Sequence, residues 1–413
     1  MPRYNGGFIG TDGLDAPDAP VGVTATAGNA QASVAFTDVG GGTSDTTSFV
    51  VQVSTNGTDY SGGSATGSSS PIDVTSLTNG TDYTAKVWAI NAYGTSRPSD
   101  ASSSFTPALP IRAIFAGGTK QAADAQVNII DYLDMDSTGN ASDFGDLSSA
   151  RDMASSAMAS STRVVFSGGG RVDNGVNTIE YVTAASTGDV TDFGDSTVWS
   201  AYPSGLSSST RGISAGGYNY SSGGQGTNAN TNVIEYITIA NTGNATDFGD
   251  QTAAHRQGAG YASTTRGIMC GGRVSSDSNV IQYITIASTG NATDFGDLTN
   301  NSLSPMQGAS NATRGLQGME YDSSATPVTT YITIASTGNS QTFGDLSARR
   351  DSGSACADST NCLFVGGNQS GSGRVNTIDY YTIASTGNAS DWGDLTQGRT
   401  SSSSTTTGHG GIS

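Results

Sequence analysis

A phrase that recurs six times after residue 110 is the strongest constraint on how this chain can fold. One copy reads YITIASTGNATDFGDLT at residues 283–299. A tyrosine stands twelve residues before an aromatic residue in every copy, whereas the spacing between copies varies from 47 to 55 residues. This pattern predicts six copies of one structural unit that differ in their loops. We number them repeats 1 to 6 by their aromatic residues: Phe144, Phe193, Phe248, Phe295, Phe343 and Trp392.

Each repeat contains four candidate β-strands. In repeat 4 they cover residues 256–263, 266–272, 280–287 and 292–298, and the turn STGN joins the last two as a tight hairpin. Four strands in roughly 40–50 residues predict one blade of a β-propeller. The chain ends with an extra first strand at 399–407, which would complete the blade begun after residue 110 and close the ring.

The composition favours an all-β protein. Lysine occurs only twice and glutamate only three times, while Thr, Val, Ile and Tyr are frequent among 57 glycines. The net charge of −18 disfavours binding to nucleic acid or to an anionic membrane. No apolar run approaches the roughly 20 residues that span a bilayer, and the N-terminus lacks the apolar core of a signal peptide.

The segment before the repeats contains short alternating strands at 32–39, 48–54, 71–77 and 82–94. The sequence LTNGTDYTAKVWAINAYGTSRPSD at 77–100 resembles a fibronectin type III domain, although Phe36 stands where that family often has tryptophan. The resemblance implies a β-sandwich in which Tyr83 forms a corner bond near Leu77. It also implies a spacer rather than a catalytic domain.

The repeats themselves resemble kelch repeats, because Arg, Gly-Gly, Tyr and Phe or Trp follow in that order. Repeat 5 departs with Gly318-Met319. We therefore expect an all-β chain: a docking arm at 1–15, a fibronectin type III-like sandwich at 16–108, and a six-bladed kelch-like propeller at 109–413, closed by the C-terminal strand. The repeated Tyr and Phe should pack the blades, and the aspartates beside each aromatic should cap turns. An arginine before each second strand could hydrogen-bond between blades or line one face: Arg112, Arg163, Arg211, Arg266 and Arg314.

Catalytic motifs are missing from the sequence. The two histidines, His255 and His409, belong to no recognisable triad or repeated metal site, so we expect neither an enzyme nor a cofactor. Calcium in the aspartate-rich turns is the alternative for a metal. Cys270 should pack as a small apolar residue, whereas Cys356 and Cys362 are either disulfide-bonded or two buried thiols.

Ligand binding is better supported than catalysis, because aromatic residues occur where the repeats diverge. Trp199 and Tyr202 lie in VWSAYPSG, and Tyr218 and Tyr220 lie in the longer repeat 3. Aromatic faces in polar loops can stack on sugar rings. The alternative is that Trp199 and Tyr202 pack the edge of repeat 2.

The whole chain resembles structural proteins of tailed bacteriophages, particularly marine phages. The likeness rests on the acidic Ser/Thr/Gly/Asn-rich composition, the arm RYNGGFIG, the fibronectin-like segment and the repeats. It implies a protein at the virion surface, on tail or capsid, whose arm residues Tyr4, Phe8 and Ile9 dock on other virion proteins. Its propeller would contact a host-surface glycan or protein, and the chain could form a homo-oligomer. The alternatives are a purely structural decoration, a secreted adhesin or a carbohydrate-active enzyme.

Overall fold

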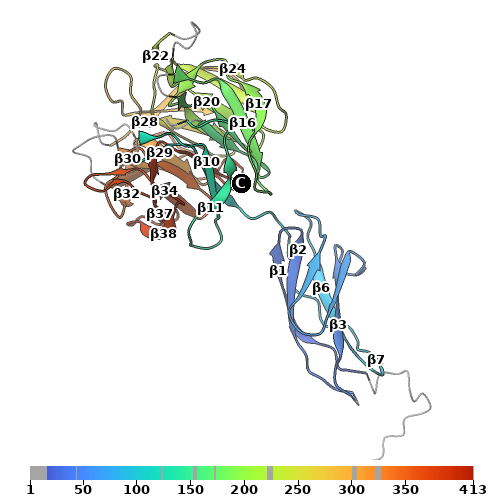
Figure 1. The fold of residues 1–413 in the computed structure, drawn as a ribbon. Helices are drawn as coiled ribbons and strands as arrows, with labels where there is room; N and C mark the ends of the chain where they lie inside the picture. The colour runs from blue at the N-terminus through green and yellow to red at the C-terminus, as the bar shows by residue number, and fades with distance from the viewer. Residues whose placement is uncertain are drawn as a thin grey trace, which may run out of the picture. The chain divides into compact units, whose positions relative to one another are not determined.

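The fold was taken from a computed structural model, which describes residues 16–42, 44–121, 124–151, 156–171, 174–220, 227–299, 305–320 and 327–412. These residues form strands and turns without an α-helix, so the predicted all-β class is confirmed (Figure 1). Accordingly, no apolar helix of membrane-spanning length occurs in the part of the chain that the structure describes. The chain divides into two compact units, Met1–Pro110 and Ile111–Ser413.

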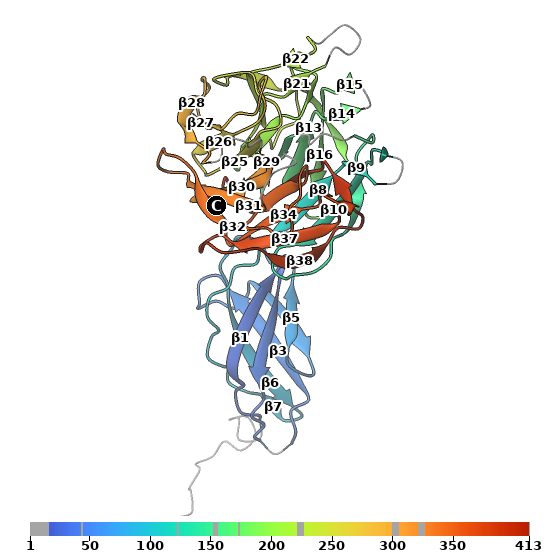
Figure 2. The ribbon, with the colours of Figure 1, turned by 90° about the vertical axis from the view of Figure 1, so that its left-hand side faces the viewer.

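The N-terminal unit contains two antiparallel sheets, drawn in blue in Figure 2. One has the order β1-β2-β5 and the other β4-β3-β6-β7. The strands are β1 (Val21–Gly28), β2 (Gln31–Thr37), β3 (Ser48–Ser54), β4 (Gly63–Gly67), β5 (Ile72–Thr75), β6 (Thr84–Asn91) and β7 (Gly94–Thr95).

Alternating side chains of both sheets form a single core. In β6, for example, Ala85, Val87 and Ala89 are fully buried and the residues between them are half-exposed, as expected for a strand with one buried face. Tyr83 is 5% exposed and its hydroxyl accepts a hydrogen bond from the Thr78 amide at 3.2 Å. The predicted corner bond beside Leu77 is therefore present.

After β7 the chain runs along β6 without forming a regular strand. Ser96, Ser99 and Ser102 each accept a hydrogen bond at 2.9 Å through the side-chain oxygen, from the amides of Ala89, Val87 and Ala85 respectively. Their own amides donate to the carbonyls of the same three residues. These serines, spaced three residues apart, thus provide hydrogen-bond partners for the backbone amides and carbonyls along one edge of β6.

The C-terminal unit contains six four-stranded antiparallel sheets, one for each repeat. Their orders for repeats 1 to 6 are β40-β8-β10-β11, β12-β13-β16-β17, β19-β20-β23-β24, β25-β26-β27-β28, β29-β30-β31-β32 and β33-β34-β37-β38. The strands are β8 (Arg112–Ala116), β10 (Ile129–Asp134), β11 (Ser142–Asp146), β12 (Ser156–Ala159), β13 (Arg163–Ser167), β16 (Thr178–Thr183), β17 (Thr191–Asp195), β19 (Ser204–Ser207), β20 (Arg211–Ala215), β23 (Val233–Thr238), β24 (Thr246–Asp250), β25 (Ala259–Ala262), β26 (Arg266–Cys270), β27 (Val280–Thr285), β28 (Thr293–Asp297), β29 (Pro305–Ser310), β30 (Arg314–Glu320), β31 (Val328–Thr333), β32 (Gln341–Asp345), β33 (Ser354–Ala357), β34 (Asn361–Val365), β37 (Thr377–Thr382), β38 (Ser390–Asp394) and β40 (Ser403–Thr406).

Short strands in the connecting loops form small additional sheets with the orders β14-β15, β18-β21-β22, β35-β36 and β39-β9. They are β9 (Thr119–Lys120), β14 (Gly170–Arg171), β15 (Asn174–Gly175), β18 (Ser200–Ala201), β21 (Tyr218–Asn219), β22 (Ala229–Asn230), β35 (Asn368–Gln369), β36 (Gly373–Arg374) and β39 (Arg399–Thr400). The three-stranded one belongs to repeat 3 and uses its longer loop.

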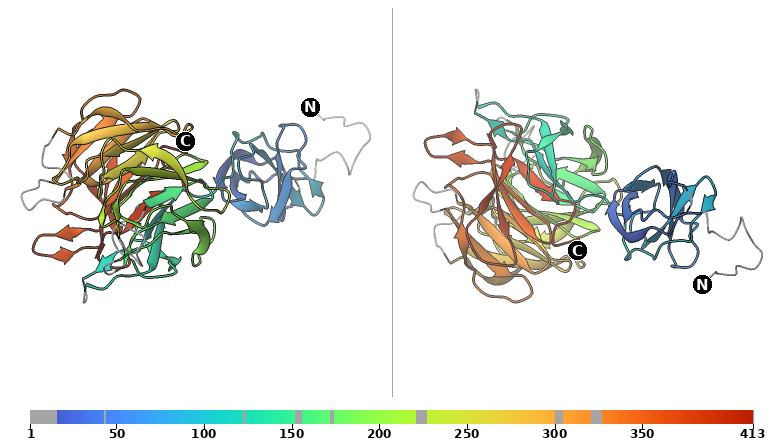
Figure 3. Two further views of the ribbon diagram at one scale, coloured as in Figure 1. Left: turned by 90° about the horizontal axis from the view of Figure 1, so that it is seen from above. Right: turned by 90° about the horizontal axis from the view of Figure 1, so that it is seen from below.

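The first strands of the six sheets contact one another in cyclic order. β12 contacts β19, β19 contacts β25, and the series continues through β29, β33 and β40 back to β12 (Figure 3). The C-terminal β40 pairs with β8, so strands from the two ends of this unit complete one sheet, as the sequence predicted.

A second cyclic set of contacts uses the STGN turn. Asn291 accepts a hydrogen bond from the Asp250 amide of the preceding repeat at 3.0 Å, and Asn140 accepts one from the Asp394 amide at 3.0 Å. Equivalent bonds join every neighbouring pair of repeats. The predicted tight hairpin is wrong: residues 286–292 separate β27 from β28 because this segment pairs with the neighbouring repeat. The predicted turn-capping aspartates are also wrong, since Asp294 and Asp297 lie within β28.

The repeated arginines form a third set of contacts between repeats. Arg211 lies over the Tyr236 ring at 4.5 Å and donates to the Ile286 carbonyl of the next repeat at 2.9 Å. Arg112, Arg163, Arg266 and Arg314 make the same two contacts. Hydrogen bonding between repeats, one of the two predicted roles, is therefore confirmed.

Candidate functional site

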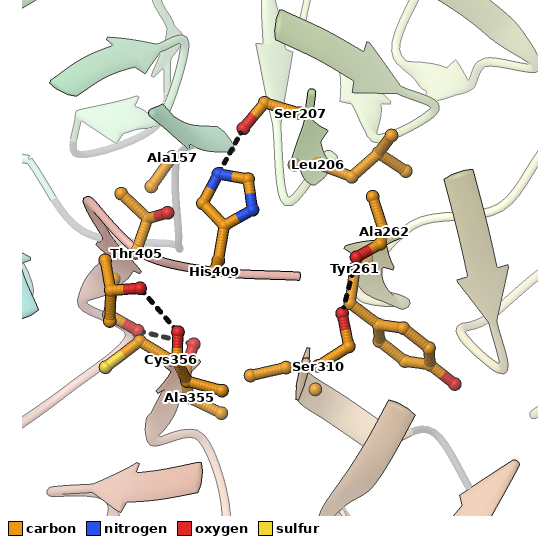
Figure 4. Close-up of a pocket in the computed structure, with 17 residues that line it drawn as sticks. Ala157, Leu206, Ser207, Tyr261, Ala262, Ser310, Ala355, Cys356, Thr405 and His409 are labelled. Atoms are coloured by element: carbon orange, nitrogen blue, oxygen red, sulfur yellow. Dashed lines mark hydrogen bonds between the residues drawn. The ribbon is translucent and has the colours of Figure 1, made fainter. Parts of the chain in front are cut away.

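The first strands surround a narrow central cavity. Its walls are mostly Gly, Ala, Ser and Thr, and its volume is ≈ 40 Å³ (Figure 4). An ordered water needs roughly 10–15 Å³, so the cavity has room for a few waters and is too small for a sugar ring. The residues after β40 cross it, and Gly410 donates to the Ser310 carbonyl at 2.9 Å.

His409 projects into this cavity beside Ser207, with its Nε2 2.9 Å from the Ser207 hydroxyl (Figure 4). The Gly411 amide donates to Nδ1 at 3.1 Å, so the proton of the neutral ring is on Nε2. Nε2 is then a donor and cannot accept the serine proton as a general base. Burial also lowers the His409 pKa to about 4, which keeps the ring neutral. The pair is therefore structural.

The cysteines are three buried free thiols, so Cys356 and Cys362 are not bonded. Cys356 pairs with Leu363 and Ala357 pairs with Cys362, which places the two sulfurs on opposite faces of the sheet. Burial raises the pKa of Cys270 to about 12, so this thiol is not a reactive thiolate.

The predicted aromatic residues of repeats 2 and 3 come together around the sheet β18-β21-β22. The rings of Tyr218 and Tyr220 pack edge to face with centroids 4.7 Å apart, and the Tyr218 hydroxyl donates to the Asn228 carbonyl. The Tyr220 amide donates to the Trp199 carbonyl at 3.0 Å. Tyr202 lies next to β18 at a positive φ, and its carbonyl accepts from the Gln257 amide at 3.0 Å. All four aromatic residues are half-buried.

Two arginines of repeat 4 complete this surface. The Arg256 guanidinium lies 5.0 Å from the centre of the Tyr218 ring, and the backbone of Arg256 pairs with that of Arg273. Arg273 is 41% exposed and lies 4.0 Å from Asp277. We call Trp199, Tyr218, Tyr220, Arg256 and Arg273 the aromatic edge. Sequence reasoning missed both arginines, because nothing local to them indicates that Tyr218 is their neighbour.

Buried ion pairs form a further pattern that sequence reasoning missed. Arg151 pairs with Glu180, Arg350 with Asp379 at 2.7 Å, and Arg399 with Asp131 at 3.0 Å, and all six side chains are at most 3% exposed. Each arginine stands seven residues after a repeat aromatic, and each carboxylate stands one residue before a repeat tyrosine. This spacing was the available signal.

Repeat 3 keeps the carboxylate of this pattern and loses the cation. Its acid is Glu235, which is 3% exposed, and the residue at the arginine position is Ser200. Glu235 accepts hydrogen bonds from the Thr197 amide at 2.8 Å and its hydroxyl at 2.7 Å. Burial raises the Glu235 pKa above its ordinary value, and the two Thr197 bonds oppose that shift. Repeat 4 replaces both charges, with His255 and Gln282.

Other predicted sites receive no further support. Tyr4, Phe8 and Ile9 lie outside the described residues. Among the residues that the structure places, no group of three or more His, Cys, Asp or Glu side chains is arranged to hold a metal ion. The chain matches no known protein-family model and no sequence among the curated proteins.

Proposed function

We propose that residues 109–413 form a six-bladed kelch-like β-propeller closed by the C-terminal strand, and that residues 16–108 form a fibronectin type III-like sandwich. Support for the propeller comes from the six four-stranded sheets, the cyclic contacts of their first strands and the pairing of β40 with β8. The corner bond of Tyr83 supports the sandwich.

We further propose that the protein is a surface appendage of a tailed-phage virion, in which the arm at 1–15 docks on other virion proteins and the propeller recognises the host surface. The observation that carries the recognition role is the aromatic edge. The six repeats share one frame of contacts, yet aromatic and cationic side chains collect where repeats 2, 3 and 4 depart from it. Exposed departures from a rigid scaffold are where binding residues occur.

Recognition is favoured over catalysis by the two sites that most resemble catalytic groups. Ser207 and His409 have the wrong proton arrangement for nucleophilic attack. Glu235 is buried, its Oε2 accepts two hydrogen bonds from Thr197, and the pocket beside it has no room for a sugar ring. Neither can present a reacting atom to a polysaccharide.

The test is localisation. An antibody against residues 111–413 should label discrete tail or capsid positions on intact particles in electron micrographs, and mass spectrometry of purified virions should detect the chain. Absence from virions would exclude a virion appendage and favour an adhesin.

Deletion of residues 109–413 then separates recognition from decoration. Particles that assemble but adsorb poorly to host cells support the recognition role. Particles that adsorb normally but break easily would show a purely structural decoration instead.

A further inference from the structure

Arg256 differs from the other well-placed arginines of the C-terminal unit. Arg151, Arg350 and Arg399 pair with buried carboxylates, and the arginines of the second strands donate to a neighbouring repeat. Among the described residues, Arg256 pairs with no carboxylate. Its buried Nε has no hydrogen-bond partner among them, a feature that it shares with Arg350 and Arg399. Within the part of the chain that the structure describes, Arg256 therefore has neither the carboxylate partner of the first group nor the carbonyl acceptor in a neighbouring repeat that the second group uses.

The position of this cation beside aromatic rings limits what can bind it. Arg256 lies against Tyr218, Tyr220 packs on the same tyrosine, and Trp199 adjoins Tyr220 through a backbone hydrogen bond. Aromatic rings offer flat apolar surface for the C–H faces of sugars, and a guanidinium binds carboxylates through paired N–H donors. A ligand that uses both groups must therefore carry ring and carboxylate together.

The small number of cations argues against a densely charged ligand. Among the side chains that the structure describes, Arg256 and Arg273 are the two cations of the aromatic edge, and Asp277 lies near Arg273. Nucleic acid requires several cations in register with its phosphates, and the net charge of the whole chain would repel it.

We propose that the aromatic edge binds an acidic glycan, with the carboxylate of a uronic-acid unit on Arg256 and neighbouring sugar rings on Tyr218, Tyr220 and Trp199. This inference rests on the proposed recognition function and names the ligand class of that site. It requires no metal ion and no covalent step.

The test uses the full chain and three hexamers in isothermal titration calorimetry. An alginate hexasaccharide supplies uronic carboxylates on sugar rings, mannohexaose supplies similar rings without charge, and hexaglutamate supplies carboxylates without sugar rings. The alginate hexasaccharide should bind at least about tenfold more tightly than either of the others, a difference expected when a charged and a stacking contact act together. Raising NaCl from 50 to 300 mM should weaken binding only a few-fold, since about one ion pair is screened.

Variants assign the binding to these residues. Arg256→Gln and Tyr218→Ala should each weaken binding of the alginate hexasaccharide about tenfold, and Arg256→Lys should fall between them and the natural protein. Arg97→Gln and Tyr93→Ala, exposed residues of the N-terminal unit, are the matched controls and should bind normally. Unchanged melting temperatures of Arg256→Gln, Arg256→Lys and Tyr218→Ala would show that their weaker binding is not caused by unfolding.

The proposal is overturned if the alginate hexasaccharide does not bind, if mannohexaose or hexaglutamate binds as tightly, or if Arg256→Gln binds like the natural protein. These results are separable from failure of the proposed function. A protein found on virions that supports adsorption, but whose adsorption is unaffected by Arg256→Gln, would keep the function and remove this ligand.

Discussion

Glu180 and Glu235 are the same residue type at the same position of neighbouring repeats, but their surroundings differ. Each lies on the third strand of its sheet, one residue before the repeat tyrosine, and each is at most 3% exposed. Glu180 pairs with Arg151, whereas the partners of Glu235 are neutral donors such as the Thr197 amide and hydroxyl. A guanidinium beside a buried carboxylate favours the ionised form of the acid, whereas burial without a neighbouring cation raises the pKa of Glu235.

This difference identifies the repeats that lack the buried ion pair. The ion pair is present in repeats 1, 2 and 6, both charges are replaced in repeat 4, and repeat 3 retains only the acid. Repeat 3 also carries the longest loop and both tyrosines of the aromatic edge, and Thr197 lies two residues from Trp199. We infer that repeat 3 lacks the stabilising ion pair because its loops form a different surface, the aromatic edge.

The largest effect expected from this comparison comes from removing one partner of the pair. Glu180→Gln leaves the Arg151 guanidinium buried without a carboxylate, so the free energy of unfolding of the C-terminal unit should fall by about 3–5 kcal/mol. Differential scanning calorimetry of the whole chain measures it. The matched change Glu235→Gln removes no ion pair and should cost about 1 kcal/mol or less.

Equal losses from the two substitutions would contradict the comparison. The double variant Arg151→Ser, Glu180→Gln removes both charges, as repeat 4 does, and should lose less stability than Glu180→Gln alone. If the double variant loses as much as the two single losses added, Arg151 and Glu180 do not interact.

Acid should destabilise the C-terminal unit through His409. Its pKa is lowered from an ordinary value of 6.5 to about 4, so the neutral ring contributes stability that is present above pH 6.5 and is lost as pH falls through 4. The loss should reach about 3 kcal/mol below pH 4, at 1.36 kcal/mol for each unit of pKa. His409→Gln should flatten this part of the stability curve between pH 6.5 and 4.

Glu235 should change the stability of the C-terminal unit with pH in the direction opposite to His409, over an overlapping pH range. Its pKa is raised above the ordinary 4.5, so its contribution is most favourable below pH 4.5 and is lost as pH rises through the folded value. Glu235→Gln should therefore be less destabilising at pH 7 than at pH 4.5. Melting temperatures measured at both pH values test the sign, and a reversed sign would show that Glu235 is stabilised as the anion.

The strands could be predicted from the sequence, because the alternation of apolar residues, the Gly-Gly pairs and the fixed Tyr-to-aromatic spacing all lie within short stretches of the chain. The all-β class, the four strands of each repeat and the pairing of the C-terminal strand were predicted for this reason. The role of STGN was not, since an asparagine that accepts a bond from the preceding repeat looks in sequence like one that forms a turn. Such contacts depend on how neighbouring repeats are placed in space, and a short stretch of sequence does not carry this information.

The candidate site was predicted only in its aromatic members. Trp199, Tyr202, Tyr218 and Tyr220 were recognisable because they interrupt polar loops. Arg256 was not recognisable, because its significance lies in a neighbouring tyrosine from another repeat and in the absence of a carboxylate among the described residues. The buried ion pairs could have been found by aligning the repeats, although the pair of Arg399 and Asp131 joins residues from the two ends of the C-terminal unit. The docking arm remains a prediction.

The smallest effect concerns the contacts between repeats. Asn291→Ala removes the acceptor for the Asp250 amide at the exposed junction of repeats 3 and 4, and should cost about 0.5–1.5 kcal/mol because water can replace the lost bond.

At the junction of repeats 1 and 2, Asp189 supplies the same acceptor to the Asp146 amide. The pKa of the Asp146 carboxylate is raised first by burial and then by the like charges of Asp189 and Asp143. Asp189→Asn keeps the acceptor and removes one of these like charges, so it should match or slightly exceed the natural protein in melting temperature at pH 7. A clear loss from Asp189→Asn would mean that the aspartate is required for more than its hydrogen bond, and that the six junctions are less alike than their geometry indicates.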